Sequence, residues 1–302
     1  MRGRPYNPRM TPSPGVHSRW TYVECPRDSW QGLHRPIPLQ SKIDYLLALL
    51  EAGFTHLDLG SFVSPKAVPQ LADTGQVLAA LPSPRPGRAD EETRDYLCII
   101  ANARGLESAA QEEKVTSVGY PLSVSDAFQR RNTGKSLEES WPLLAELRAL
   151  ASEADKRLVV YLSMGFGNPD GEPWAVQTSL DAVARCRDLG VSDVALADTV
   201  GRASPELVAE VCRAAVARFG PDKLGVHLHA RSEQAVALAL AARDAGIRWF
   251  EGALGGVGGC PFAGDTLVGN LPTEQIAPAL GLPFENLSVL AERARALQYD
   301  YA

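Results

Sequence analysis

Two histidines separated by one residue, His227 and His229, are the first candidates for chemistry in this sequence. They lie in GVHLHA (225–230), a short apolar run typical of a strand, and alternate strand residues share a face, so we expect both imidazoles on one side. Two imidazoles with nearby carboxylate and amide oxygens suit Mg²⁺ or Mn²⁺ and also admit Zn²⁺. Asp28 and Asn270 are the candidate oxygen ligands. A pair of hydrogen-bonded core histidines is the alternative.

A cysteine beside a run of glycines is the second candidate. GGVGGCPFAGDTLVGN (255–270) places Cys260 after glycines that allow positive φ angles and loop movement, so we expect the thiol to reach a reacting carbon as proton donor or acceptor. A buried, inert thiol is the alternative. The glycines do not predict a nucleotide-binding turn, because no GxGxxG opens a helix here and Pro261 follows the cysteine directly.

An arginine next to the candidate acid Asp28 is the third. Arg27 keeps its proton at any working pH, and its guanidinium can fork onto a carboxylate or onto a developing enolate oxygen. An ion pair with an acid such as Asp58 is the alternative, and the two roles are compatible. Asp58 is itself a candidate catalytic carboxylate.

The elements that must position these residues follow one repeated pattern. From Trp20 onward, short apolar runs alternate with amphipathic stretches, which predicts a parallel sheet covered by helices. Eight strands favour an α/β fold closed as a TIM (β/α)8 barrel over an open doubly wound sheet, which the same alternation would also produce. The predicted strands are WTYVECP (20–26), HLDLGSF (56–62), YLCIIAN (96–102), SVGYPLS (117–123), LVVYLSM (158–164), DVALADT (193–199), GVHLHA (225–230) and WFEGAL (249–254).

Residues that commonly start or end helices lie between these runs. SKIDYLLALLEAG has Ser41 as a candidate cap at its start and Gly53 at its end. Ser204 precedes a proline at a first helical position, and SEQAVALALAARDAG ends on Gly246. The segment 125–156 is longer than one ordinary helix, so we expect two helices there, or one helix and an active-site loop.

Unusual polar residues fall at the carboxyl ends of five predicted strands, which is where a barrel gathers its loops and its active site. These ends are ECPRDSWQG, LDLGSF, ADT, HLH and the glycine loop. A single acid in such a place is more often a helix cap, but agreement among five ends favours a site. Gln31, Asp198 and Thr199 are therefore candidate substrate contacts.

Composition is that of an ordinary folded protein. The 302 residues are 45% hydrophobic and 22% charged, which is enough apolar material for a buried core. A formal net charge of -6 gives no attraction for nucleic acid, and no apolar run approaches the roughly 20 residues that span a bilayer, so we expect a small-molecule partner. Five scattered cysteines without CxxC spacing predict a reducing, cytoplasmic location. We expect a disordered leader over 1–19 and one catalytic barrel domain over 20–302.

Several longer stretches resemble the 3-hydroxy-3-methylglutaryl-CoA (HMG-CoA) lyases, members of the metal-dependent lyase and Claisen-synthase superfamily of TIM barrels. PRDSWQ resembles the family's PRDGLQ, GSFVSPKAVPQLAD its TSFVSPKWVPQMAD, and ADTVGRASP its GDTIGVGTP. HLH and GGVGGCPFAGDTLVGNLPTE continue the match in order, so the resemblance covers roughly residues 20–295. SMGFGNPDGEPW differs from the well-known lyases and suggests a bacterial side branch.

The resemblance implies roles for particular residues. It implies that Arg27 stabilises an enolate and that Cys260 transfers a proton. Asp58 stands where the family usually has glutamate, one methylene longer. The divalent cation would be held by Asp28, His227, His229 and Asn270. Further departures from the family pattern, which affect the acyl pocket more than the reaction class, are Ser29, Trp30 and Ala230.

The resemblance also implies a reaction, the cleavage of HMG-CoA or a related 3-hydroxyacyl-CoA to acetoacetate, or another ketone, and acetyl-CoA. The general base is left open between Asp28 and a histidine of the metal site. The alternatives are a Claisen-type synthase joining an acyl-CoA to a 2-oxo acid, a hydroxy-oxo-acid aldolase, and a barrel that binds a metabolite without turnover. Synthases of this kind carry a further C-terminal domain, and only about 30 residues follow Asn270, which favours the lyase. Family likeness suggests a homodimer.

Overall fold

The structure is a computed structural model that describes residues 20–85, 93–259 and 268–302. The leader expected over 1–19 and the candidate Cys260 lie outside the described residues.

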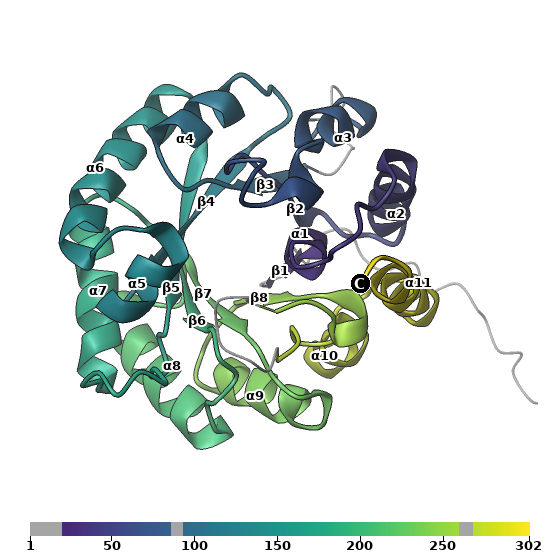
Figure 1. The fold of residues 1–302 in the computed structure, drawn as a ribbon. Coiled ribbons are helices and arrows are strands. Elements are labelled where there is room, and N and C mark those ends of the chain that lie inside the picture. The colour runs from purple at the N-terminus through teal and green to yellow at the C-terminus, as the bar shows by residue number, and fades with distance from the viewer. Residues whose placement is uncertain (1–19, 86–92, 260–267) are drawn as a thin grey trace, which may run out of the picture.

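Eight parallel strands close into a barrel, as the sequence predicts (Figure 1). Each strand pairs with the next along the chain, and β1 also pairs with β8, from Thr21 against Trp249 to Glu24 against Gly252. An open doubly wound sheet has no such closing pair, so that alternative is excluded. The strands are β1 (Thr21–Glu24), β2 (His56–Ser61), β3 (Asp95–Ile99), β4 (Ser117–Ser123), β5 (Arg157–Ser163), β6 (Asp193–Asp198), β7 (Leu224–Leu228) and β8 (Trp249–Gly252).

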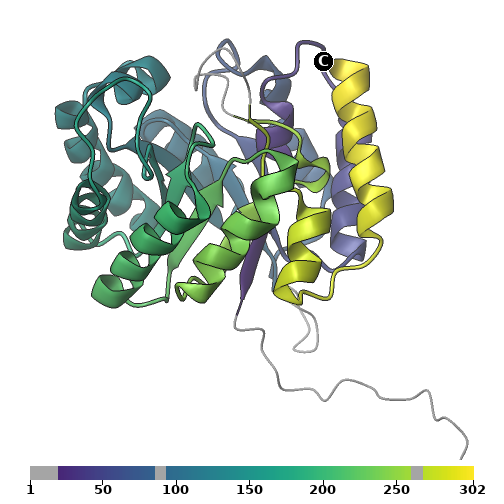
Figure 2. The same ribbon diagram turned by 90° about the horizontal axis from the view of Figure 1, so that it is seen from below.

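Helices surround the barrel and cover the outer face of its strands (Figures 1 and 2). Among the described residues, no helix is long and apolar enough to cross a membrane. The helices are α1 (Pro26–Trp30), α2 (Leu39–Glu51), α3 (Thr74–Ala80), α4 (Ala103–Ala110), α5 (Asp126–Thr133), α6 (Leu137–Glu153), α7 (Val176–Asp188), α8 (Pro205–Phe219), α9 (Ser232–Asp244), α10 (Thr273–Leu280) and α11 (Leu287–Tyr301), with short 3₁₀ turns η1 (Pro69–Leu71) and η2 (Leu254–Gly256).

The observed helix boundaries confirm most of the predicted helix starts and ends and correct one of them. Ser204 caps α8 by accepting a hydrogen bond from the backbone N–H of Leu207. The long segment after β4 forms two helices, α5 and α6, separated at Gly134, whose φ of 71° is the left-handed conformation that glycine adopts freely. Ser41 is not a cap: α2 begins two residues earlier, after Pro38, because the fixed φ of proline suits the entry to a helix.

The apolar core has two parts. The larger part lies between strands and helices, and each large aliphatic side chain buried there stabilises the fold by about 1.5–3 kcal/mol. A smaller cluster fills the barrel interior below its mouth and includes Val159, Tyr161 and Trp249. Gly225 on β7 makes room for this floor, because a Cβ at that position would overlap the indole ring of Trp249.

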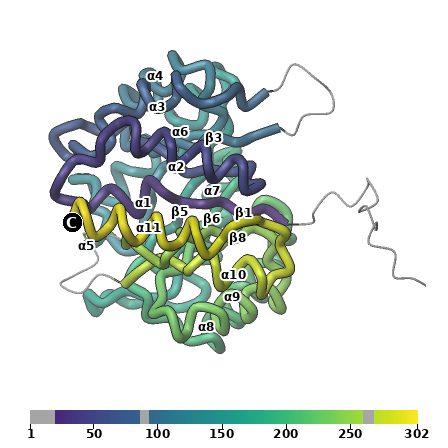
Figure 3. Tube along the Cα trace, turned by 90° about the vertical axis from the view of Figure 1, so that its right-hand side faces the viewer, coloured from purple at the N-terminus to yellow at the C-terminus, as the bar shows by residue number. Residues whose placement is uncertain are grey.

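The last helices seal the junction of the first and last strands. In Figure 3, α11 (yellow) lies beside α2 (purple), and the two helices are in contact. The backbone N–H of Arg35, which follows α1, donates to the carbonyl of Tyr301 at 3.0 Å. Residues from both ends of the described chain therefore meet beside β1, the strand that leads into α1.

Candidate active site

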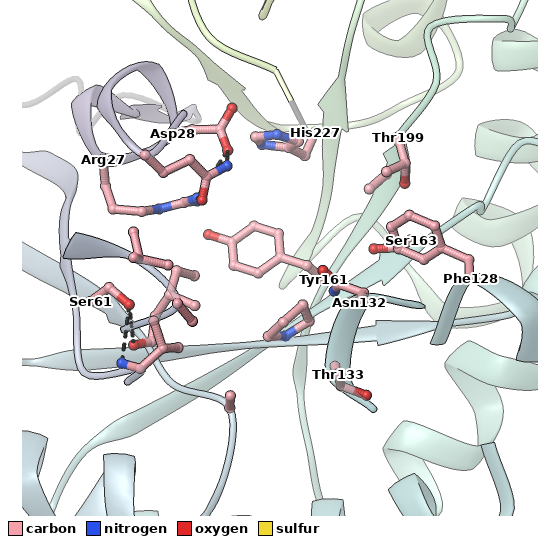
Figure 4. A pocket seen from close by; sticks show the side chains of 18 of the residues that line it. Arg27, Asp28, Ser61, Phe128, Asn132, Thr133, Tyr161, Ser163, Thr199 and His227 are labelled. Atoms are coloured by element: carbon pink, nitrogen blue, oxygen red, sulfur yellow. Dashed lines mark hydrogen bonds and ion pairs between the residues drawn. The ribbon is translucent and has the colours of Figure 1, made fainter. Parts of the chain in front are cut away.

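A short helix directly after β1 brings the first two candidates to the barrel mouth. α1 begins at Pro26, where the missing N–H of proline costs nothing because the first turn leaves its N–H groups unpaired. Within this one turn, Arg27 and Asp28 are buried and point toward the space above the strands (Figure 4). The predicted strand 20–26 thus ends earlier than expected and gives its last residues to the helix.

Arg27 is held by acids on two sides. Its Nε donates to both carboxylate oxygens of Asp58 at 3.0 and 3.1 Å, and its Nη1 donates to Asp28 and to Gln31, each at 2.9 Å. Burial alone would lower the pKa of Arg27, but Asp58 and Asp28 raise it above its ordinary value. The ion pair expected between Arg27 and Asp58 is therefore confirmed. Asp58 is fully buried beneath the arginine and holds its guanidinium in place.

The carboxylate of Asp28 lies among donors. It accepts from Arg27, from Nε2 of Gln31 at 2.7 Å and from Nδ2 of Asn270 at 2.7 Å. Burial works to raise the pKa of Asp28, but Arg27, with smaller help from the two histidines and Asn270, holds the pKa well below its usual range. Asp28 is thus an anion at neutral pH and, being buried, favours a positive neighbour.

The two histidines converge on the same place. Their ring centroids are 5.0 Å apart, and ligand atoms of Asp28, His227 and His229 all lie within 4.8 Å of one another. Burial and the neighbouring His227 lower the pKa of His229 to about 4, so its imidazole is neutral at pH 7. Asn270 joins them through an isolated antiparallel bridge to His229. The four predicted ligands are therefore neighbours, although Asp28 and Asn270 come from opposite ends of the barrel domain.

Two buried polar atoms at this place are unpartnered in the described part of the chain. Nδ1 of His229 and Oδ1 of Asn270 have no hydrogen-bond partner among the described residues. A buried acceptor without a donor, such as Oδ1 of Asn270, costs about 1–3 kcal/mol, and a cation would relieve that cost. One carboxylate, one amide oxygen and two imidazoles form a mixed donor set that fits a divalent metal ion. The residues present thus fit the expected cation.

A cavity of about 350 Å³ opens directly above these groups, at the carboxyl ends of the strands. Val63, Val68, Ile99 and Phe128 are among its apolar lining residues, so the cavity can also contact a hydrocarbon group. In Figure 4, Tyr161 lies between Arg27 on one side and Thr199 on the other. The polar lining residues are Arg27, Asp28, Gln31, Ser61, Ser64, Asn102, Asn132, Thr133, Tyr161, Ser163, Thr199, His227 and His229.

The candidate substrate contacts differ in position. Gln31 and Thr199 line the cavity, and their contact with a substrate stays a prediction. Asp198 lies outside the described lining, and its carboxylate accepts the backbone N–H groups of Arg202 and Ala203, which fixes the turn after β6. Asp198 therefore stabilises the turn that leads into α8, whose cap is Ser204, and its contact with a substrate stays a prediction.

The described part of the glycine loop shows why a residue without a side chain is needed there. Gly258 has a φ of 89°, and a Cβ there would lie 2.7 Å from Cα of Ser29 and 2.8 Å from the carbonyl oxygen of Asp28. The carbonyl of Val257 accepts from Nδ2 of Asn270 at 2.9 Å. Glycine thus lets the loop pass directly over α1 and its metal-ligand candidate. Cys260 follows this contact and lies outside the described residues.

Sequence reasoning did not select two buried groups near the histidines. Glu251 on β8 accepts from His227 Nδ1 at 2.8 Å, and Tyr161 on β5 faces the cavity. Burial works to lower the pKa of His227, but the hydrogen bond to Glu251 raises it above its ordinary value. A signal was available for both residues: each sits in a predicted barrel strand, on the alternation that faces the lumen.

Comparison with known proteins agrees with these features. The HMGL-like family model matches residues 22–283. Hydroxymethylglutaryl-CoA lyase YngG of Bacillus subtilis is 32% identical over 83% of this chain and 81% of its own length. An (R)-citramalyl-CoA lyase of Chloroflexus aurantiacus is also 32% identical, over 86% of this chain and 83% of its own.

A solved structure of an HMG-CoA lyase from Acinetobacter baumannii, in complex with coenzyme A and 3-methylmalate, superposes with a TM-score of 0.81 at 28% identity. The superposition covers 93% of this chain and 91% of that one. By sequence and by fold, this chain belongs to the HMGL-like family.

Proposed function

We propose that this protein is a cation-dependent carbon–carbon lyase that cleaves HMG-CoA, or a closely related 3-hydroxyacyl-CoA, to acetoacetate or another ketone and acetyl-CoA. One observation carries the proposal: Asp28, His227 and His229 meet at the floor of a cavity beside Arg27, next to the buried amide oxygen of Asn270, which has no donor among the described residues. Such a set suits a substrate that brings a hydroxyl and a carboxylate to a cation.

The cation would be held by Asp28, His227, His229 and Asn270. When bound, Mg²⁺ or Mn²⁺ supplies Lewis-acid chemistry, lowering the pKa of a hydroxyl that coordinates it and fixing the orientation of that hydroxyl. His229 suits this task because its low pKa keeps the imidazole neutral, and neutral imidazole is the ligand form. Ionised Asp28 supplies the negative charge of the set.

The chain's own residues would move the proton and stabilise the charge. Asp28 or a histidine of the set takes the proton of the tertiary hydroxyl. The C2–C3 bond then breaks, leaving a ketone at C3 and an electron pair on the thioester enolate. Arg27, already fixed by Asp58, directs its charge at that enolate. Cys260 returns a proton to C2, which completes acetyl-CoA.

The substrate is proposed from the relatives named above. One relative acts on hydroxymethylglutaryl-CoA and another, equally identical, on (R)-citramalyl-CoA, so citramalyl-CoA is the second candidate. The two thioesters share the tertiary hydroxyl, the methyl group and the terminal carboxylate. They differ by one methylene between the hydroxyl carbon and the carboxylate. A cleavage assay with both thioesters therefore tests which chain length the protein accepts.

A two-substrate assay tests the proposal. The protein with Mn²⁺ is given each thioester, and acetoacetate, pyruvate and acetyl-CoA are quantified by mass spectrometry. We expect acetyl-CoA together with acetoacetate from HMG-CoA, and none from an Asp28→Asn control that keeps the fold. If a folded, Mn²⁺-binding protein cleaves neither thioester, the lyase proposal is wrong. Consumption of acetyl-CoA with a 2-oxo acid in a parallel reaction would instead identify a synthase.

A further inference from the structure

A buried carboxylate lies directly beneath the candidate cation site. Glu251 on β8 is 1% exposed, and its Oε2 accepts from His227 Nδ1 at 2.8 Å. The same oxygen is 3.9 Å from the thiol of Cys25. Its Oε1 accepts from the hydroxyl of Tyr161 at 3.2 Å and from the indole N–H of Trp249 at 3.1 Å. Both carboxylate oxygens are therefore supplied with donors from four neighbouring side chains.

We propose that Glu251 is the positioning residue of the cation site, acting through the imidazole of His227. The inference rests on the proposed cation site. Neutral imidazole has one N–H and one lone pair, and an ionised carboxylate only accepts. Because Glu251 accepts the proton on Nδ1, the lone pair of His227 is on Nε2, the nitrogen available to a ligand in the cavity that His227 lines.

The same carboxylate also fixes the orientation of the ring. Tyr161 packs edge-on against His227, with ring centroids 5.8 Å apart, and its hydroxyl donates to Glu251. A metal-ligand candidate and a side chain of the cavity wall thus share one anchor on the barrel floor. A shift of Glu251 would move both, so the carboxylate couples cation binding to the shape of the cavity.

A rival arrangement uses the same atoms. Cys25, His227 and Glu251 also have ligand atoms within 4.8 Å of one another and could hold a second ion. Neither Cys25 nor Glu251 belongs to the described lining of the cavity, so an ion there would have no open side. The short Nδ1 to Oε2 distance of 2.8 Å is that of a direct hydrogen bond, which occupies the ligand atoms of both residues.

Glu251→Gln tests the role because an amide has one acceptor and one donor end. With its oxygen toward Trp249 and Tyr161, the amide satisfies both donors, and its NH₂ then donates to Nδ1 of His227. The proton moves to Nε2, and the lone pair no longer faces the cavity. We expect the affinity for Mn²⁺, measured by isothermal titration calorimetry, to fall about tenfold to a hundredfold. Nitrogen-15 NMR of histidine-labelled, metal-free protein should report the change of tautomer.

A double variant supplies a matched rescue. Trp249→Phe removes the indole N–H that donates to Glu251 and leaves Glu251 to accept from His227, so we expect the Mn²⁺ affinity to stay within about twofold. In the double variant Glu251→Gln with Trp249→Phe, the indole N–H no longer competes with the NH₂ group of the new glutamine side chain. That NH₂ group can then donate to the hydroxyl of Tyr161, while the amide oxygen accepts the Nδ1 proton of His227. We expect this double variant to regain most of the lost affinity, which a general loss of stability would not do.

The outcomes separate this inference from the proposed function. If the wild-type protein does not bind Mn²⁺, the proposed cation site fails. If it binds Mn²⁺ in a manner that depends on His229, yet Glu251→Gln binds equally well or the double variant gives no recovery, the positioning role is wrong. Binding of two Mn²⁺ per chain, with one lost in Cys25→Ala, would establish the rival ion site. Should Glu251→Gln not fold, Glu251→Met, which keeps the length of the side chain but cannot accept the Nδ1 proton as a carboxylate does, is measured instead. Unchanged Mn²⁺ affinity with an unchanged His227 tautomer would overturn the role.

Discussion

The side-chain amide of Asn270 donates hydrogen bonds through its NH₂ group, while its oxygen is left available as an acceptor or ligand. Its Nδ2 donates to Asp28 and to the carbonyl of Val257, while its Oδ1 has no donor among the described residues. The NH₂ group of Asn270 therefore orders the carboxylate of Asp28 and the glycine loop, and its oxygen offers a lone pair to a ligand. The sequence predicts Asn270 as an oxygen ligand, and the structure gives that prediction its geometry.

The site residues that sequence reasoning found share one property, an uncommon residue type at a strand end. His227, His229, Asp28 and Arg27 are recognisable because imidazole pairs and adjacent opposite charges stand out against apolar strands. Glu251 was not predicted because nothing in the run WFEGAL indicates that this acid contacts His227. That histidine lies 24 residues earlier, on the neighbouring strand β7. Register across a barrel is information that a single strand does not contain.

His229→Ala should weaken cation binding. The variant loses one imidazole ligand, and we expect the affinity for Mn²⁺ to fall at least about tenfold, or 1.4 kcal/mol, in a calorimetric titration. His34→Ala changes an exposed histidine outside the cavity and serves as control. Equal affinities in the two variants would remove His229 from the proposed site.

Cys260→Ser should lower turnover while leaving fold and metal content intact. A serine hydroxyl is a much weaker acid than a thiol, so we expect kcat to fall on the order of a hundredfold. The measurement is steady-state cleavage of HMG-CoA, with circular dichroism and metal analysis of the same sample. Cys186→Ala, in α7 and outside the cavity lining, is the matched control. Unchanged kcat in Cys260→Ser would refute the proton-transfer role.

At the scale of elements, β1 is tied to the last third of the chain by a second buried acid. Glu24 accepts from the backbone N–H of Leu254 at 2.7 Å and from the hydroxyl of Thr273 at 2.6 Å. Thr273 accepts in turn from Tyr22 at 2.9 Å. This network joins β1, the η2 turn before the glycine loop, and the start of α10. Burial raises the pKa of Glu24 to about 8.

Glu24 should make stability depend on pH. Because its pKa in the folded chain lies above the ordinary value of 4.5, the native state holds a proton that the unfolded chain releases. The contribution is present in full below about pH 4.5 and is lost as the pH rises to about 8, a change on the order of 5 kcal/mol. We expect Glu24→Gln, which mimics the protonated form, to flatten the dependence in urea unfolding between pH 5 and 8. Parallel curves for the two proteins would contradict this.

Element prediction succeeded where a local pattern decides the structure. The eight strands were found because apolar runs bounded by polar ends persist in every repeat, and their observed bounds differ from the predicted ones by only a few residues. Ser41 was assigned to the wrong place because a proline three residues earlier starts α2, and tertiary packing extends the helix back to it. The turn into α1 was also hidden, because PRDSW is too short to show a helical period.

At the scale of the whole molecule, the barrel should be more stable with its cation. A ligand that binds only the folded state stabilises by RT ln(1 + [L]/Kd), about 2.7 kcal/mol at a concentration one hundred times Kd. We expect such Mn²⁺ concentrations to raise Tm by several degrees in differential scanning calorimetry, with the gain reversed by a chelator. Asp28→Asn should show little gain. A Tm that does not respond to Mn²⁺ in the wild-type protein would count against a site in the folded barrel.

Closure of the barrel has a consequence for the time at which the site can exist. Asp28 and Asn270 are hydrogen-bonded across 242 residues, and β1 acquires its second neighbour only when β8 is present. A ribosome makes the chain from the amino end, so a nascent polypeptide carrying Asp28, His227 and His229 still lacks the fourth proposed ligand until Asn270 has emerged. Chains released before Asn270 therefore lack part of the proposed ligand set, and we expect a complete cation site only in chains synthesised at least as far as Asn270.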